Sequence, residues 1–257
     1  MAGTLDGKSA IIYGGGGSLG AAVAGTFARE GARVFLAGRT RETLEAAAKG
    51  SDAEVAVLDA TDERAVDEHV AAVAAATGSV DISFNLISRG DVQGTPLIEL
   101  ATADLLRAVD TGLTSSFVTA RAAARVMVER GSGVILHLNS GSGAGAMPGM
   151  GSTGPADAAT EALMRYLAAE LGPRGVRVCG IWTAGVAETL TDAKLQAVGG
   201  PGTPSAAAAV EMIASMAALR RAPRLADVAE TAAFLASDRA GGITGTMTNV
   251  TSGLVLK

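Results

Sequence analysis

Residues 9–20 read SAIIYGGGGSLG, in which a short apolar run leads directly into a glycine-rich turn. A segment of helical periodicity follows, over residues 18–30. Gly15, Gly17 and Gly20 have the spacing of the dinucleotide-binding turn, in which glycines let the backbone approach a pyrophosphate at a helix N-terminus. The alternative is a flexible surface turn, which the flanking strand and helix patterns disfavour. The expected dinucleotide contacts are Gly14, Gly16, Gly17, Ser18, Leu19 and Gly20.

The rest of the chain alternates short apolar runs with Ala-rich segments of helical period. The expected strands are 9–13, 33–37, 55–59, 82–86, 133–139, 177–182 and 247–250, and the expected helices are 18–30, 41–49, 63–77, 102–129, 155–171 and 225–236. Continuous apolar strands between helices indicate right-handed crossovers. The sequence therefore predicts an α/β fold, a Rossmann-type doubly wound parallel sheet of about seven strands with helices on both faces.

The chain reads as one domain over residues 1–257, because no linker or internal repeat divides it. One irregular insertion, residues 183–224, contains Gly199-Gly200-Pro201-Gly202 and a helix-like segment at 205–219. An insertion after the carboxyl end of a strand is expected to form a lid over a ligand cleft. Its Ala and Met content favours an apolar substrate, although the same residues could simply pack the lid helix.

Composition excludes several classes of function. Hydrophobic residues make up 48% of the chain and charged residues 18%, which indicates a compact globule. A net charge of −5 and 3% aromatic residues argue against nucleic acid as a partner. We expect no membrane span and no signal peptide, and hence a cytoplasmic protein. Cys179 is the single cysteine, so no internal disulfide forms, and two distant histidines provide no metal site.

The end of the second strand bears on the choice of cofactor. NAD sites usually have Asp or Glu here for the ribose 2′-OH, whereas this chain has Gly38 followed by Arg39 and Thr40. A guanidinium suits a 2′-phosphate, which favours NADP(H) over NAD(H). The alternative is that Arg39 is only a solvated residue before the next helix.

These elements together resemble the short-chain dehydrogenase/reductase family over nearly the whole chain. The glycine turn is similar to the family's Thr-Gly-x-x-x-Gly-x-Gly, with Gly14 and Gly20 kept and Tyr13 and Ser18 replacing Thr and Gly. Asp59 falls on the family's adenine-binding Asp, although it could instead cap the helix beginning near residue 62. The resemblance implies an NAD(P)-dependent oxidoreductase acting on a small molecule. Further expected cofactor contacts are Asp59, Ala60, Asn85, Leu86, Ala184 and Val186.

The active-site motif departs from the family pattern. Ser140 matches the family's catalytic Ser, but its Tyr and Lys positions hold Thr153 and Asp157, and its Asn position holds Gly112. Asn85 matches the first residue of the family's Asn-Asn-Ala-Gly motif. Because it is a polar residue inside an apolar run, we expect it to make a structural hydrogen bond and not to act in catalysis. We treat Ser140, Thr153 and Asp157 as the candidate catalytic residues.

The replacements weaken the family's acid–base chemistry. A phenol next to an ammonium is a usable general acid, whereas the hydroxyl of Thr153 is far weaker and Asp157 disfavours a nearby alkoxide. His137, three residues before Ser140, is expected on the opposite face of the strand and in the core. Efficient ketone reduction by the family's usual route is therefore not expected.

Three functions remain open. The first is an NADP(H)-dependent oxidoreductase with a degenerate site and unknown substrate, and the second is a non-catalytic NADP(H) sensor or inactive partner subunit. In the third, the fold is kept only for assembly, without a cofactor. The resemblance also implies a homo-oligomer, a tetramer, formed through the Ala-rich helices 102–129 and 155–171 and the apolar C-terminal end.

Overall fold

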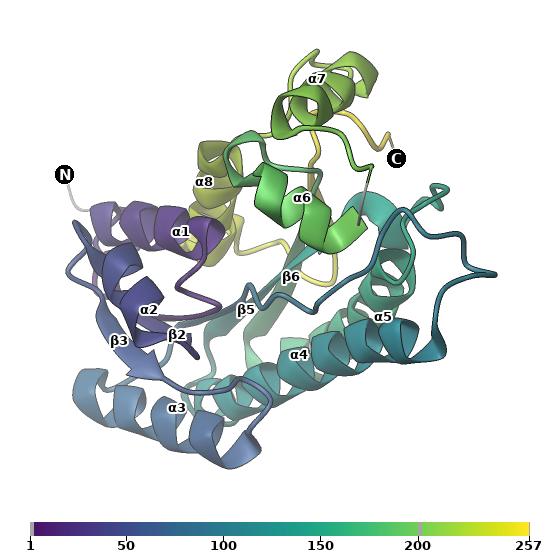
Figure 1. Cartoon of the computed structure of the whole chain (residues 1–257). Coiled ribbons are helices and arrows are strands. Elements are labelled where there is room, and N and C mark those ends of the chain that lie inside the picture. Colours follow the sequence, from purple (N-terminus) through teal and green to yellow (C-terminus); the bar gives the residue numbers. More distant parts are fainter. Residues whose placement is uncertain (1–2, 200–201, 257) are drawn as a thin grey trace.

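The computed structural model describes residues 3–199 and 202–256. Its centre is one sheet of seven parallel strands in the order β3-β2-β1-β4-β5-β6-β7 (Figure 1). The strands are β1 (Ser9–Tyr13), β2 (Arg33–Gly38), β3 (Glu54–Val57), β4 (Ile82–Asn85), β5 (Gly133–Ser140), β6 (Val176–Thr183) and β7 (Met247–Val250). The expected doubly wound parallel sheet of seven strands is confirmed.

Helices cover both faces of this sheet (Figure 1). One face carries α1 (Ser18–Arg29), α2 (Arg41–Ala48) and α8 (Leu225–Ala236), and the other carries α3 (Glu63–Thr77), α4 (Thr102–Arg130) and α5 (Thr153–Leu171). Short 3₁₀ turns lie at Gly141–Gly143, Gly172–Arg174, Ala187–Thr189 and Asp238–Ala240. Two further helices, α6 (Asp192–Gly199) and α7 (Ala206–Met216), lie beyond the end of the sheet, on the side of α8.

The strands are apolar throughout because alternate side chains enter two separate cores. In β1, Ile12 packs in the core under α1 and α8, whereas Ile11 and Tyr13 pack in the core under α3, α4 and α5. All five residues of β1 are buried. The continuous apolar runs of the sequence therefore correspond to helices on both faces.

The strand order reverses between β1 and β4, which pair with each other. From β1 the chain continues outward to β2 and β3 on one side, and from β4 it continues to β5, β6 and β7 on the other side. Tyr13 is aligned with Ala37 on one side and with Asn85 on the other, so the carboxyl ends of β2, β1 and β4 lie together. Ligands of open α/β sheets bind at such a switch point.

The structure differs from the predicted elements mainly at ends and in the insertion. Strand β3 ends at Val57, so Asp59 lies in the following loop rather than in the strand. Helix α6 was not predicted, because its sequence lacks a regular apolar stripe and none of its described residues is buried. Helix α7 covers 206–216 of the expected 205–219, with Ser205 as its N-cap. Gly200 and Pro201 of the insertion lie outside the described residues.

Candidate functional site

The glycine turn shapes a cleft of about 420 Å³ at the switch point. Gly14 has φ +76°, and a Cβ there would lie 2.5 Å from the Leu86 carbonyl oxygen. Helix α1 begins after Gly17, whose N-cap position provides no side-chain hydrogen bond. The first N–H groups of α1 are therefore left for an anionic ligand, which fits a dinucleotide pyrophosphate. The turn residues that line the cleft are Gly14, Gly16, Gly17, Ser18, Leu19 and Gly20.

The unusual Tyr13 of the turn does not obstruct this cleft. Its side chain is fully buried in the core beneath α3 and α4, on the far side of the sheet from α1. Burial raises the pKa of its hydroxyl well above the ordinary value. Ser18 is exposed and borders the cleft. The two departures from the family's glycine motif are therefore compatible with a bound dinucleotide.

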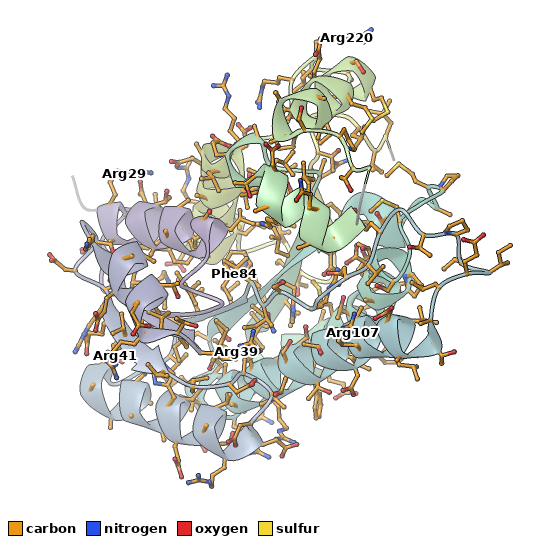
Figure 2. The ribbon with its side chains drawn as sticks, viewed as in Figure 1. Arg29, Arg39, Arg41, Phe84, Arg107 and Arg220 are labelled. Atoms are coloured by element: carbon orange, nitrogen blue, oxygen red, sulfur yellow. The ribbon has the colours of Figure 1, made fainter. Side chains whose placement is uncertain are left out.

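One wall of the cleft is formed by residues that follow β2 and β3. Arg39 comes directly after β2 and two residues before Arg41, the first residue of α2, and both arginines are labelled in Figure 2. Arg39 and Thr40 line the cleft. Asp59 and Ala60 line it from the loop after β3. In the described part of the chain Arg39 forms no salt bridge.

Asp59 is not the cap of α3. It accepts hydrogen bonds from the Thr61 backbone N–H at 2.9 Å and from the Thr61 hydroxyl at 2.7 Å. These bonds lower the pKa of Asp59, with a further contribution from Arg39. Asp62 is the N-cap and accepts from the Ala65 N–H. The capping alternative for Asp59 is therefore wrong, and Asp59 is one of the residues that line the cleft.

The remaining expected cofactor contacts divide between two places. Leu86 lines the cleft, whereas Asn85 lines a smaller cavity next to it. The Asn85 amide donates to the hydroxyls of Ser115 and Thr119 at 3.3 and 3.4 Å, and its oxygen accepts from the Ile87 N–H. Ala184 and Val186 are not among the residues that border the cleft, and their contacts with the cofactor stay predictions.

Sequence reasoning missed several residues of the cleft. Thr43 of α2, Thr111 of α4, Thr189 and Lys194 all line it. Lys194 lies on α6, so the insertion places a cation at this cleft. The sequence signal was weak, because Lys194 is an isolated lysine in a segment without a clear helical pattern.

The end of β5 brings two of the candidate catalytic residues together. The Ser140 hydroxyl donates to Asp157 Oδ2 at 2.5 Å, and the Ser140 N–H donates to the same oxygen at 3.1 Å. The Ser140 oxygen also accepts from the Ser142 N–H. Asp157, on the first turns of α5, is completely buried. Ser140 is thus hydrogen-bonded to Asp157, the residue at the position where the family's Lys is expected.

An arginine that the sequence did not single out completes this network. Arg89, in the loop after β4, donates from Nη1 to Asp157 Oδ1 at 2.7 Å and pairs through Nη2 with Asp91 at 3.1 Å. Gly112 of α4 makes room for it, since a Cβ at this position would lie 2.6 Å from Arg89 Cδ. Asp157 and Gly112, at the positions where the sequence comparison expects the family's Lys and Asn, are therefore parts of one arrangement built around Arg89.

The protonation of this pair is set by opposing effects. Burial raises the pKa of Asp157, and Arg89 and the Ser140 hydroxyl offset only part of that increase. Burial lowers the pKa of Arg89, but Asp157 and Asp91 outweigh it and raise the pKa overall. Arg89 therefore stays a cation.

Thr153 is the first residue of α5, one helical turn before Asp157, but it has a hydrogen-bond partner of its own. Its hydroxyl accepts from Gln93 Nε2 at 3.0 Å, and its side chain is buried. The N-cap of the helix, Ser152, accepts from the Val92 N–H. The loop after β4 therefore contacts the start of α5 through Gln93 and Val92 as well as through Arg89.

A cavity of about 170 Å³ lies between β4, β5, α4 and α5 and is lined by Arg89, Gly112, His137 and Ser140 among others. His137 is buried in the sheet, as expected, and it lines the same cavity as Ser140. Burial lowers the pKa of His137 to about 4, so the imidazole is neutral near pH 7. In the described residues its Nε2 has no hydrogen-bond partner.

The described residues contain no cluster of His, Cys, Asp or Glu able to hold a metal ion. Across the same ranges, no helix combines the length and hydrophobicity needed to cross a membrane. A cleft at the switch point of a doubly wound sheet, bordered by a glycine turn and a helix N-terminus, is typical of the class of Rossmann-type dinucleotide-binding proteins.

Comparisons with known proteins specify this class further. The family described as "Enoyl-(Acyl carrier protein) reductase" matches residues 15–255. The chain is 31% identical to "Oxidoreductase asL5" of Sarocladium schorii, over 97% of this chain and 96% of that protein. It is also 31% identical to gluconate 5-dehydrogenase of Gluconobacter oxydans (strain 621H), over 74% of this chain and 75% of that protein.

Among solved structures, that of levodione reductase matches with a TM-score of 0.87 at 26% identity, covering 97% of this chain and 98% of the other. The chain belongs to the short-chain dehydrogenase/reductase family. Members of this family are oxidoreductases that use NAD(P) cofactors on small-molecule substrates.

Proposed function

We propose that the protein is an NADP(H)-dependent oxidoreductase with an altered active site. The observation that carries the proposal is Arg39, an exposed guanidinium at the cleft where NAD sites usually place a carboxylate. Thr40 lines the cleft beside it and Lys194 lines it from the insertion. These groups suit the extra phosphate of NADP(H), because charge-assisted hydrogen bonds to phosphate are about twice as strong as neutral ones.

In this proposal the chain's own residues position the two reactants. The turn at Gly14–Gly17 and the start of α1 hold the pyrophosphate, and Arg39 holds the 2′-phosphate. The nicotinamide supplies a hydride when bound. Ser140 lies at the end of β5 where a substrate would meet the nicotinamide, and Asp157 orients its hydroxyl. No phenol–ammonium pair supplies a proton, so the substrate is one that needs little acid catalysis.

The insertion at 183–224 acts as a lid in this proposal. Thr189 and Lys194 already border the cleft, and α7 presents the exposed side chains of Met212 and Met216. Such a surface suits an apolar small-molecule substrate. The unit of function is a homo-tetramer, which is supported by exposed apolar side chains on α4, including Phe117. Light scattering would refute the tetramer by giving the mass of a monomer.

A second candidate is a non-catalytic NADP(H) sensor or inactive subunit. It is favoured by the hydrogen bonds that already occupy the site, since Asp157 is bound by Ser140 and Arg89, and Thr153 by Gln93. A site of this kind binds cofactor without turning it over.

Calorimetry and a turnover assay together test these functions. We expect a lower Kd for NADP⁺ than for NAD⁺, and Arg39→Ala should remove the preference while Arg41→Ala, on the next helix, should keep it. Equal binding of the two cofactors would refute the NADP(H) assignment. NADPH oxidation with a panel of carbonyl, imine and activated alkene substrates then separates the candidates. Turnover supports the oxidoreductase, and cofactor binding without any turnover supports the sensor.

A further inference from the structure

The hydrogen-bonding state of Ser140 restricts what this serine can offer a substrate. A serine hydroxyl has one hydrogen and two lone pairs. The hydrogen is directed to Asp157 Oδ2 at 2.5 Å, and the oxygen accepts from the Ser142 N–H at 3.2 Å. The Asp157 carboxylate also accepts from the Ser140 N–H and from Arg89 Nη1. All of its partners are therefore donors, and the Ser140 hydroxyl donates its hydrogen to Asp157 as well. Toward the cavity, Ser140 therefore presents a lone pair, an acceptor.

The charged residues around Ser140 also favour a substrate that donates a hydrogen bond. Arg89 is the cation of the small cavity, and its hydrogen bonds are directed to the carboxylates of Asp157 and Asp91. A further carboxylate, Glu161, is buried beside the turn after Ser140, where a Cβ on Gly143 would lie 2.7 Å from its Oε1. Around Ser140, the three acidic side chains Asp157, Asp91 and Glu161 therefore outnumber the one guanidinium.

An acceptor in a negative environment is poorly suited to a carbonyl group. Hydride addition to C=O places negative charge on oxygen, which needs a donor or a cation. A protonated imine has the opposite needs. It carries a positive charge and an N–H of its own, and hydride addition removes the charge instead of creating one. A carboxylate-linked acceptor stabilises such a cation by hydrogen bonding and by charge.

We propose that the substrate of this site is a protonated imine, whose N–H donates to the Ser140 oxygen that Asp157 orients. The inference rests on the proposed NADP(H)-dependent function. One hydride from NADPH forms a C–H bond at the imine carbon, the π pair of the C=N bond moves to nitrogen, and NADP⁺ and a neutral amine result. The proton on nitrogen enters with the substrate from solution, so no tyrosine-like acid is needed. Ser140 is the catalytic residue and Asp157 and Arg89 are positioning residues.

Matched pairs of probes test the inference. The imines 2-methyl-1-pyrroline and 3,4-dihydroisoquinoline are compared with the ketones 2-methylcyclopentanone and 1-tetralone, with NADPH as reductant. We expect kcat/KM for the imines to exceed that for the ketones about tenfold or more, the size of one charge-assisted hydrogen bond. A second readout needs no turnover: in calorimetry with NADP⁺, pyrrolidinium should bind more tightly than cyclopentanol.

Variants then locate the effect. Asp157→Asn frees the Ser140 hydroxyl to donate, so the imine-to-ketone ratio of kcat/KM should fall about tenfold or more. Asp67→Asn, from the exposed ion pair with Arg125, should leave the ratio unchanged. If Asp157→Asn does not fold, Ser140→Ala is the alternative variant. It should raise KM for the imine and weaken pyrrolidinium binding, while NADP⁺ binding is retained.

The outcomes separate this inference from the function on which it rests. NADPH binding with faster reduction of ketones, or with no reduction of the imines, overturns the imine assignment. In the first of these cases the oxidoreductase function survives. Equal binding of pyrrolidinium and cyclopentanol also overturns the assignment. Absence of NADP(H) binding overturns both proposals.

Discussion

Replacing Arg89 by Met should destabilise the fold by an amount that depends strongly on pH. Met keeps much of the arginine stem but removes the guanidinium that pairs with Asp157 Oδ1 at 2.7 Å. Asp157 has no exposed surface, and the Arg89 side chain is only 13% exposed. Removing one partner of a buried ion pair typically costs about 3–5 kcal/mol, because a charge remains without compensation.

The pH dependence follows from the freedom of Asp157 to take up a proton. Burial already raises its pKa, and the loss of Arg89 raises it further. In the unfolded chain the carboxyl has a pKa of about 3.9, so keeping it protonated in the fold costs about 1.4 kcal/mol for each pH unit above that value. In the variant this cost is about 4 kcal/mol at pH 7 and about 1.5 kcal/mol at pH 5, and the difference from the wild type is smaller, because burial already raises the pKa of Asp157 there. A group whose folded pKa is raised loses stability as pH increases, so the variant weakens toward high pH.

Urea unfolding of the wild type and of Arg89→Met at pH 5, 6, 7 and 8 measures this difference. Arg125→Met is the matched control, because Arg125 pairs with Asp67 at 3.2 Å on the surface, where both side chains are exposed. We expect the control to change the free energy of unfolding by about 1 kcal/mol or less. The double variant Arg89→Met with Asp157→Asn should lose most of the pH dependence.

A loss of stability at Arg89→Met that does not vary between pH 5 and pH 8 would refute the reasoning. A loss no larger than that of Arg125→Met would refute it as well. Either result would mean that Asp157 does not depend on Arg89 for its charge.

Three further predictions concern other residues. Burial holds the pKa of His137 at about 4, so stability should fall by ~3 kcal/mol as pH drops from 6.5 to 4, and urea unfolding of His137→Asn should lack this slope. Lys194→Ala should raise the calorimetric Kd for NADP⁺ about two- to fivefold at low salt and less at high salt, whereas Lys49→Ala, outside the cleft lining, should not. Gly14→Ala should lower the free energy of unfolding by about 1–3 kcal/mol in thermal unfolding, because φ at Gly14 is +76° and the added Cβ would lie too close to the Leu86 carbonyl. Gly25→Ala in α1 is the control and should not destabilise the fold, because its Cβ would meet nothing within 4 Å.

The fold was largely predictable from the sequence because each strand is a continuous apolar run and each covering helix has its own apolar face. The glycine turn was equally readable, since its function depends on residues adjacent in the chain. Element ends were less predictable. Strand β3 ends at Val57 although the Leu58 N–H still donates to the Gly38 carbonyl, and in the turn that follows Asp59 accepts two hydrogen bonds from Thr61.

The site was only half predictable for a physical reason. Thr153 and Asp157 could be located by their spacing from Ser140, but the partner of Asp157 is 68 residues away, in a loop without a regular pattern. The sequence did contain a trace of the arrangement, since a charged residue, Arg89, follows an apolar strand end and Gly112 lacks a side chain. Only the fold shows that the two features belong together.

The contacts among Arg89, Gly112 and Asp157 also limit which single mutations toward the family's usual residues this chain can tolerate. Asn at position 112 would collide with Arg89, whose Cδ lies 2.6 Å from the place of a Cβ. Lys at position 157 would put two buried cations within contact distance, and loss of Arg89 would leave Asp157 buried without its partner. A change at position 112, 89 or 157 alone is therefore expected to be destabilising, so these three positions are expected to change together. Engineering toward a Tyr–Lys site should accordingly begin with Arg89 and Asp157 in one construction step.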